Sequence, residues 1–181
     1  MSDGTAEAPL GRLQHADADA DLYAAKSASG VILCGSCRAL SKCRLGLHRE
    51  TLGADGVVVS EIRCPRDNEG GPNVAHGGWT AGILDEMVGH AVIMRDEFAV
   101  TGTLNITFVK PVPIERPLIG RAWIVRREGR RVFVEASLEL VGSGVVVASA
   151  DAILVRRPAD HFQKHEAWLH SLDAEAVVDG A

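Results

Sequence analysis

One long apolar segment, from Gly77 to Met94, constrains the fold of this chain more than any other feature. Its hydrophobic residues recur in pairs that begin four positions apart, the spacing that places side chains on one face of an α-helix. That face consists of Ile83, Leu84, Met87, Val88, Ala91 and Val92. A helix with so broad an apolar face must be covered by other elements, so the rest of the chain has to provide that cover.

The start of this helix carries the residues of greatest chemical interest. His76 precedes it, and its first two residues are Gly77 and Gly78. Glycines let a ligand approach the backbone closely, and the free amides of a first helical turn favour a developing negative charge. Farther along, Asp85 and Glu86 place carboxylates in an apolar helix, which is costly unless they have a partner or a function. Asp85 lies nearer the apolar face, roughly 110° from its centre on a helical wheel, and is the better candidate for a catalytic acid.

Period-two alternation predicts strands on both sides of the helix. Two strands are expected before it and four after it, joined by short turns, over residues 44–52, 56–64, 101–108, 118–126, 131–141 and 145–156. In the first strand after the helix, we expect one polar face made of Thr101, Thr103, Asn105 and Thr107. A peripheral helix is expected over residues 161–172. This order predicts an α+β fold in which an antiparallel sheet wraps around one central helix.

Length and charge narrow the class of protein. The chain of 181 residues suits one domain, which we place at 31–157, between a disordered or weakly ordered tail at 1–30 and a C-terminal helix and tail at 158–181. A net charge of −5 without a dense basic block argues against a nucleic-acid partner. No apolar run is long enough to span a membrane, and the acidic start lacks a secretory pattern, so we expect a cytoplasmic protein with no membrane partner.

The four cysteines allow more than one interpretation. Cys34 and Cys37 have the spacing of a zinc-binding pair, which Cys43, Cys64 or His48 would have to complete. Structural zinc sites usually contain two such pairs, and only one is present here. We therefore favour reduced cysteines without a metal and without a cofactor, while a redox pair is a further alternative.

The residues His76-Gly77-Gly78 with Asp85-Glu86, followed by Leu104-Asn105-Ile106-Thr107-Phe108 and Lys110-Pro111, resemble the hotdog-fold acyl-CoA thioesterases. The phenylacetate-pathway type is the most similar branch. The resemblance covers roughly residues 34–155, most of the chain. It implies a hotdog fold and the hydrolysis of an acyl-CoA thioester to a free acid and coenzyme A.

The resemblance also implies roles for individual residues. Asp85 matches the catalytic carboxylate, and the amide of Gly77, beside His76, matches the group that polarises the thioester carbonyl. Thr101, four residues before Asn105, matches the hydroxyl that orients the attacking water. We expect substrate-binding residues to include Asn73, Gly78, Trp79, Thr103, Arg130 and Arg131. Relatives often carry Asn or Gln six residues before the His, where this chain has Gly70.

Spacing along the helix argues for a shared site. Gly77 and Asp85 are eight residues apart, roughly 12 Å along a helix, so both cannot contact one thioester within one protomer. Two protomers with antiparallel central helices would bring Gly77 of one near Asp85 of the other. We therefore expect a homodimer, or a dimer of dimers forming a homotetramer.

Other functions remain as alternatives. A non-catalytic acyl-CoA binding or sensing module would keep the pocket but would not need Asp85, and a dehydratase-like hotdog would need a different His and Asp arrangement. A Ser-His-Asp hydrolase is excluded because no Gly-x-Ser-x-Gly elbow is present. The sequence does not distinguish general-base catalysis from an anhydride intermediate, coenzyme A from acyl carrier protein, or one acyl chain from another.

Overall fold

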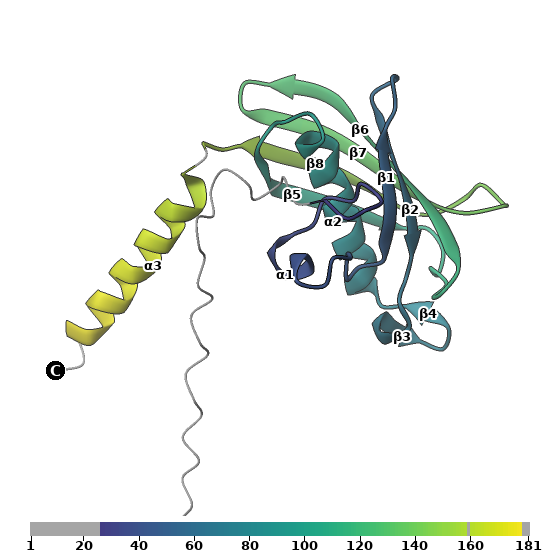
Figure 1. Cartoon of the computed structure of the whole chain (residues 1–181), viewed down its shortest axis with the longest axis horizontal. Coiled ribbons are helices and arrows are strands. Elements are labelled where there is room, and N and C mark those ends of the chain that lie inside the picture. The colour runs from purple at the N-terminus through teal and green to yellow at the C-terminus, as the bar shows by residue number, and fades with distance from the viewer. Residues whose placement is uncertain (1–25, 159, 179–181) are drawn as a thin grey trace, which may run out of the picture.

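The structure is a computed structural model that describes residues 26–158 and 160–178, with side chains described up to residue 172 (Figure 1). Most of the tail predicted at 1–30 lies outside the described residues. The helices are α1 (Gly35–Arg38), the 3-10 helix η1 (Arg66–Asn68), α2 (Gly77–Ile93) and α3 (His161–Val178). The strands are β1 (Leu47–Leu52), β2 (Val57–Arg63), β3 (Glu69–Gly71), β4 (Val74–Ala75), β5 (Ala99–Phe108), β6 (Pro117–Glu128), β7 (Arg131–Leu140) and β8 (Val145–Arg156).

Six strands form one antiparallel sheet in the order β1-β2-β6-β7-β8-β5, and β3 pairs with β4 in a separate hairpin. Helix α2 packs along one face of the large sheet and contacts β2, β5, β6, β7 and β8 (Figure 1). Strands β1 and β5 form the two edges of this sheet. The expected α+β architecture, with an antiparallel sheet around one long helix, is therefore confirmed.

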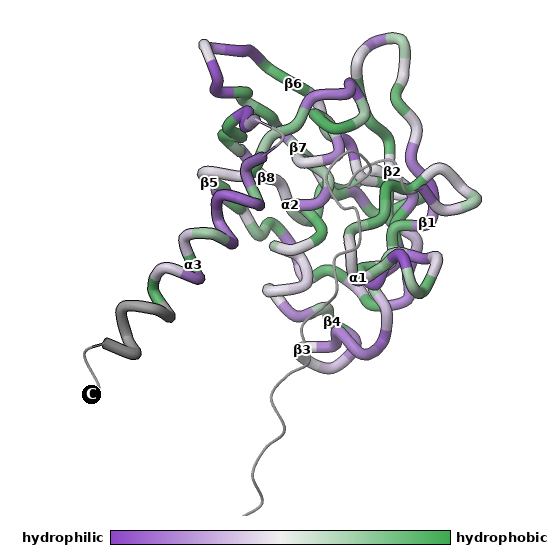
Figure 2. The backbone as a smooth tube through the Cα atoms, turned by 60° about the vertical axis from the view of Figure 1, so that its left-hand side comes forward, coloured by the Kyte–Doolittle hydropathy of each residue, from purple (hydrophilic) through white to green (hydrophobic). Residues whose placement is uncertain are grey.

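Side-chain periodicity accounts for the packing. The six residues predicted to form the apolar face of α2 are all fully buried, and each of the five that are larger than alanine contributes about 1.5–3 kcal/mol by leaving water. Strand β7 buries alternate residues from Val132 to Leu138 against this helix face, as its sequence predicts. Figure 2 shows that hydrophobic segments concentrate in the body formed by the sheet and α2.

Strand β5 departs from strict alternation at Gly102. Thr101 is opposite Leu154 of β8, whereas Thr103 is opposite Ile153, so Gly102 is the extra residue of a β-bulge. A Cβ at position 102 would lie 3.2 Å from a methyl group of Val155, which explains why glycine suits this position. The prediction of a single polar face from Thr101 to Thr107 is therefore wrong, because the bulge turns Thr101 towards α2.

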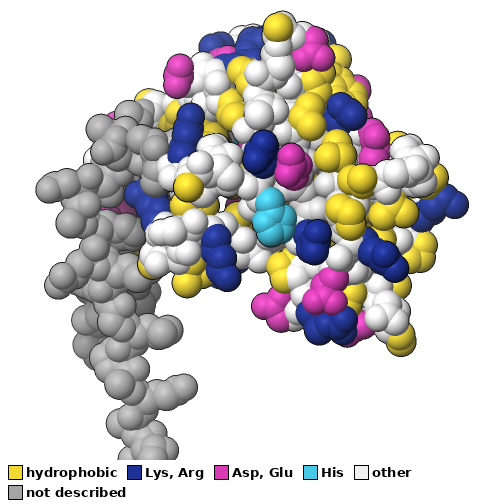
Figure 3. Space-filling model, turned by 45° about the vertical axis from the view of Figure 1, so that its right-hand side comes forward, with side chains coloured by type: hydrophobic (Ala, Val, Ile, Leu, Met, Phe, Trp, Pro, Cys, Tyr) yellow, Lys and Arg dark blue, Asp and Glu magenta, His cyan; other side chains and the backbone are white. Residues whose placement is uncertain are grey.

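Helix α3 extends away from the body of the molecule and contacts it near its start, where the rings of Phe98 and Phe162 are 5.7 Å apart (Figure 1). None of the described helices is long and apolar enough to cross a membrane. On the face shown in Figure 3, basic and acidic side chains are interspersed.

Candidate active site

The first turn of α2 presents a free amide. His76 is the N-cap residue, and its Nδ1 accepts a 2.9 Å hydrogen bond from the Gly78 N–H. The His76 N–H in turn donates to the Asn68 carbonyl at 2.8 Å, which fixes the approach to the helix. The N–H of Gly77 has no acceptor among the described residues. This amide is at the positive end of the α2 dipole, where a developing negative charge is stabilised.

An open apolar surface adjoins this amide. A Cβ at Gly77 would lie 3.7 Å from the ring of Phe108, the last residue of β5, so the ring lies directly over the start of α2. Phe108 is 58% exposed and the next residue, Val109, is 50% exposed. An aromatic ring that lies against the backbone yet remains this exposed can form one wall of an acyl-binding surface.

The candidate acid has a specific hydroxyl partner. Asp85 is half-buried on α2, and Thr101 Oγ1 of β5 donates a hydrogen bond of 2.8 Å to Asp85 Oδ1. Asp85 Oδ2 has no hydrogen-bond partner among the described residues. The residues that match the catalytic carboxylate and the water-orienting hydroxyl are therefore in contact, and one carboxylate oxygen is available to a proton or an electrophile.

A second, buried network on α2 was not predicted. His90 lies between two carboxylates, with Nδ1 2.7 Å from Glu50 Oε2 and Nε2 3.2 Å from Glu86 Oε2. Ser60 donates to Glu50 Oε1 at 3.0 Å. Burial opposes the charged imidazole, but the hydrogen bonds to Glu50 and Glu86 outweigh it and raise the pKa of His90 to about 9. Glu86 is thus occupied by an ion pair, whereas Asp85 is not.

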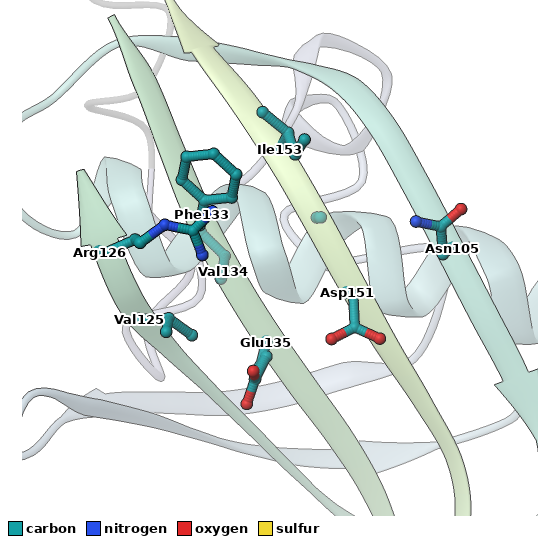
Figure 4. Close-up of a pocket in the computed structure, with 9 residues that line it drawn as sticks. Asn105, Val125, Arg126, Phe133, Val134, Glu135, Asp151 and Ile153 are labelled. Carbon is teal, nitrogen blue, oxygen red and sulfur yellow. The ribbon is translucent and has the colours of Figure 1, made fainter. Parts of the chain in front are cut away.

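Two predicted substrate-binding residues lie in different parts of the molecule, Trp79 in the core and Thr103 on a face of the sheet. Trp79 is buried, and its Nε1–H donates to the Leu45 carbonyl at 3.1 Å, so the indole packs in the core. Thr103 and Asn105 are two residues apart on β5, so their side chains lie on the same face of the sheet. Asn105 lines a groove of about 240 Å³ on the sheet face away from α2 (Figure 4). Neither residue is next to Asp85.

The loop before α2 explains why this chain has Gly70 where relatives often carry Asn or Gln. A Cβ at Gly70 would lie 2.6 Å from the Cα of His76, so the backbone leaves no room for the Asn or Gln of the relatives. Asn73 adopts a left-handed φ of 58°, its N–H donates to Glu69 and its carbonyl accepts from the Ile114 N–H. The backbone of Asn73 therefore shapes this loop, and its exposed side chain remains available.

The four arginines around the β6–β7 turn differ in their contacts. Arg126 lies 3.5 Å from the centre of the Phe133 ring, and Arg127 forms an ion pair of 2.6 Å with Glu97. Arg130 and Arg131 form no ion pair with any described residue. These two exposed guanidinium groups are therefore the ones available to an anion.

The cysteines lie in the segment that precedes the sheet and at the end of β2. All four are free thiols. Within the described part of the chain, no three His, Cys, Asp or Glu side chains are grouped so that they could hold a metal ion.

Part of the chain is similar to a known protein family. The profile of the thioesterase superfamily matches residues 72–147, which include the start of α2, Asp85 and Thr101. Mouse acyl-coenzyme A thioesterase THEM4 is 30% identical over 88 residues, which cover 49% of this chain and 38% of the mouse protein. The chain therefore spans well under half the length of this relative.

Solved structures have the same fold. Zebrafish thioesterase superfamily member 2 superimposes with a TM-score of 0.54 at 21% identity, over 60% of this chain and 79% of the zebrafish chain. A Streptococcus mutans protein bound to acetyl-CoA superimposes with a TM-score of 0.53 at 20% identity, over 56% of this chain and 82% of that protein. The predicted hotdog fold is confirmed.

Proposed function

We propose that this protein hydrolyses an acyl-CoA thioester to a free acid and coenzyme A, because its residues 72–147 match the thioesterase superfamily. The observation that carries the proposal is the hydrogen bond between Thr101 and Asp85, on the same helix whose first amide is free. A carboxylate and an unoccupied helix-start amide are the two groups that thioester hydrolysis requires, one to activate the nucleophile and one to stabilise the oxyanion.

In this proposal Asp85 acts through its free Oδ2, either as a general base towards water or as a nucleophile that forms an anhydride. The Thr101 hydroxyl orients the carboxylate through Oδ1, and its oxygen accepts a hydrogen bond from the attacking water. The Gly77 N–H donates to the thioester oxygen as negative charge develops on it. His76 contributes by capping the helix, since its Nδ1 is already bonded to the Gly78 N–H.

We propose that each site is shared by two protomers of a homodimer. Gly77 and Asp85 are two turns apart on one helix, roughly 12 Å by its rise, so a thioester that contacts both needs groups from two chains. Strand β5 supports this arrangement because it is an edge strand of ten residues that pairs only with β8 within the described sheet. Long edge strands are stabilised by pairing with another chain. A dimer of dimers is compatible with the same contact.

We propose that Arg130 and Arg131 bind the phosphates of coenzyme A. Both are exposed and free of ion pairs among the described residues, and guanidinium groups bind phosphate in a bidentate manner. Arg131 is opposite Val155, which is opposite Val100 at the start of β5, whereas Gly77 lies beside Phe108 at the end of β5. The arginines and Gly77 of one chain are thus at opposite ends of β5, as a shared site would require.

The decisive experiment is a panel of acyl-CoA thioesters that differ in chain length and aromaticity, with turnover followed by loss of thioester absorbance. We expect hydrolysis of at least one member and its loss in Asp85→Asn. Acyl-CoA binding by calorimetry without any turnover across the panel would instead favour the binding or sensing module. A parallel panel of acyl carrier protein thioesters identifies the carrier, and the preferred acyl group tests membership of the phenylacetate-pathway type.

A further inference from the structure

The segment between residue 33 and β1 contains two neighbouring thiols that the proposed hydrolysis does not use. Cys34 is exposed at the start of α1, and Cys37, one turn later, is only 4% exposed. The Cys37 N–H donates to the Cys34 carbonyl at 2.9 Å, and side chains three positions apart in a helical turn are neighbours. The two thiols of the Cys34-Gly35-Ser36-Cys37 sequence are therefore neighbours on one helical turn, and we call them the Cys34–Cys37 dithiol.

Arg44 gives this dithiol the surroundings of a reactive thiol. Its backbone N–H donates to Cys37 Sγ at 3.3 Å, and its guanidinium group interacts with both thiols. Burial raises the pKa of Cys37, but the Arg44 N–H, the Cys34 thiol and the Arg44 side chain outweigh burial, so the pKa lies below its ordinary value. Burial and the hydrogen bond to Cys37 raise the pKa of Cys34. Hydrogen-bond donors and a cation near a thiol favour the thiolate, which is the reactive form.

The other two cysteines lack these features. Cys64 is fully buried in the core, and burial raises the pKa of its thiol to about 11. Cys43 is half-buried in the same segment as the dithiol, and burial also raises its pKa to about 11. Both resemble structural cysteines that pack as small apolar side chains. The contrast within one chain makes Cys43 a matched control for the dithiol.

We propose that Cys34 and Cys37 form a reversible disulfide by exchange with a low-molecular-weight disulfide. Cys34 attacks first because it is exposed, whereas Cys37, the thiol that Arg44 activates, is buried from the small disulfide. Cys34 gives its proton to solvent, attacks one sulfur of the disulfide as a thiolate and expels one small thiolate, which leaves a mixed disulfide on Cys34. The Cys37 thiolate then attacks the Cys34 sulfur and expels the second small thiolate. The protein loses two thiol protons and two electrons, and the small disulfide becomes two thiols, so the exchange is balanced.

The direct test measures which thiols are lost. Reduced full-length protein is equilibrated with mixtures of oxidised and reduced glutathione, free thiols are blocked with N-ethylmaleimide, and the products are located by mass spectrometry. We expect the protein to lose two of its four alkylatable thiols, both in the peptide that contains Cys34 and Cys37, and to regain them with dithiothreitol. Four free thiols at every ratio, or a disulfide that includes Cys43 or Cys64, would overturn the proposal.

Single-site variants test each step of the exchange. Cys37→Ser should stop at the mixed disulfide with glutathione on Cys34, Cys34→Ser should lose no thiol, and Cys43→Ser should form the disulfide as wild type does. Arg44→Ala should slow alkylation of the dithiol severalfold at neutral pH, with partial recovery in Arg44→Lys, since the rate follows the thiolate fraction.

Circular dichroism shows whether each variant is folded. A variant is compared with the wild type only if it retains the wild-type spectrum. The exposed Cys34→Ser alone suffices if Cys37→Ser does not fold. A Cys34→Ser variant that still loses two thiols would contradict the proposal. Stoichiometric zinc retained on Cys34 and Cys37 would also contradict the proposal, because thiolates bound to a metal are not free to attack a disulfide. These readouts do not depend on thioester turnover, so failure of the proposed hydrolysis would leave the result unchanged.

Discussion

The Thr101 hydroxyl donates a 2.8 Å hydrogen bond to Asp85 Oδ1, and it does so because Gly102 forms a bulge in β5. Without the bulge, the strand register would keep Thr101 on the same face as Thr103 and Asn105, away from α2. Bulges often re-aim one side chain next to a functional site. Here the bulge connects the edge strand to the acid of the central helix.

We expect Thr101→Val, which keeps the shape but removes the hydroxyl, to lower turnover by about ten- to a hundredfold, since a hydrogen bond to a charged group is worth about 1.5–3 kcal/mol. Thr101→Ser should restore most of the turnover because it restores the hydroxyl. Steady-state kinetics on the best acyl-CoA substrate measure both. If Thr101→Ser were as slow as Thr101→Val, the methyl group and its packing, not the hydroxyl, would be the important feature.

Substitutions at Asp85 and at its neighbour Glu86 should show that Asp85 is the acid that turnover requires. Asp85→Asn should lower turnover by at least about a hundredfold, the smaller end of the range for loss of a general base. Glu86→Gln should leave turnover nearly unchanged, because Glu86 pairs with His90 and not with Thr101. Both variants are assayed beside their melting temperatures. The assignment of the acid would be wrong if Glu86→Gln lost turnover while Asp85→Asn retained it.

Local periodicity predicts most of this fold. The helix predicted from Gly77 to Met94 ends one residue earlier, and the predicted strands differ from the observed ones mainly at their ends. These elements are long and amphipathic, so their period is visible in the sequence. Four short elements were not predicted, α1, η1, β3 and β4, because four, three, three and two residues are too few to show a period.

Contacts between distant residues were the part that the sequence could not predict. His90 and Glu50 are 40 positions apart, and no local pattern shows that a helix and a strand will bring them together. The bulge at Gly102 was also missed, since one glycine in a strand is only weak evidence for a bulge. In contrast, Asp85 and Thr101 were assigned together from the family resemblance, and the structure brings these two residues into contact.

The two glycines at the start of α2 should respond differently to substitution. A Cβ at Gly77 meets only the exposed Phe108 ring at 3.7 Å, so Gly77→Val should keep the fold while lowering turnover by about a hundred- to a thousandfold, as loss of one oxyanion donor does. A Cβ at Gly78 would lie 2.9 Å from His76 Nδ1 and would break the cap, so Gly78→Ala should lower the melting temperature. A Gly77→Val protein with full turnover and a lowered melting temperature would reject the oxyanion role.

The buried network should make stability depend on pH in the alkaline range. The folded protein raises the pKa of His90 from 6.5 to about 9, so the imidazolium contributes stability that is fully present below about pH 6.5 and is lost as pH rises through 9. The effect is on the order of 3 kcal/mol. Urea unfolding between pH 6 and pH 10 measures it. The control is the double variant His90→Gln with Glu50→Gln, in which this slope should be absent, and an equal slope in both proteins would contradict the prediction.

Mixing two inactive variants tests whether the site is shared. Asp85→Asn and Gly77→Val should each be inactive as homodimers. In a mixed dimer, one site would combine Gly77 from the Asp85→Asn chain with Asp85 from the Gly77→Val chain and would be intact, while the other would carry both substitutions. Half of the dimers are mixed at equal ratio and each has one good site, so co-expression should restore about a quarter of wild-type turnover. Sedimentation of the same samples establishes that they are dimers or larger. Samples that contain mixed dimers but recover no turnover would show that each chain uses its own Gly77 and Asp85.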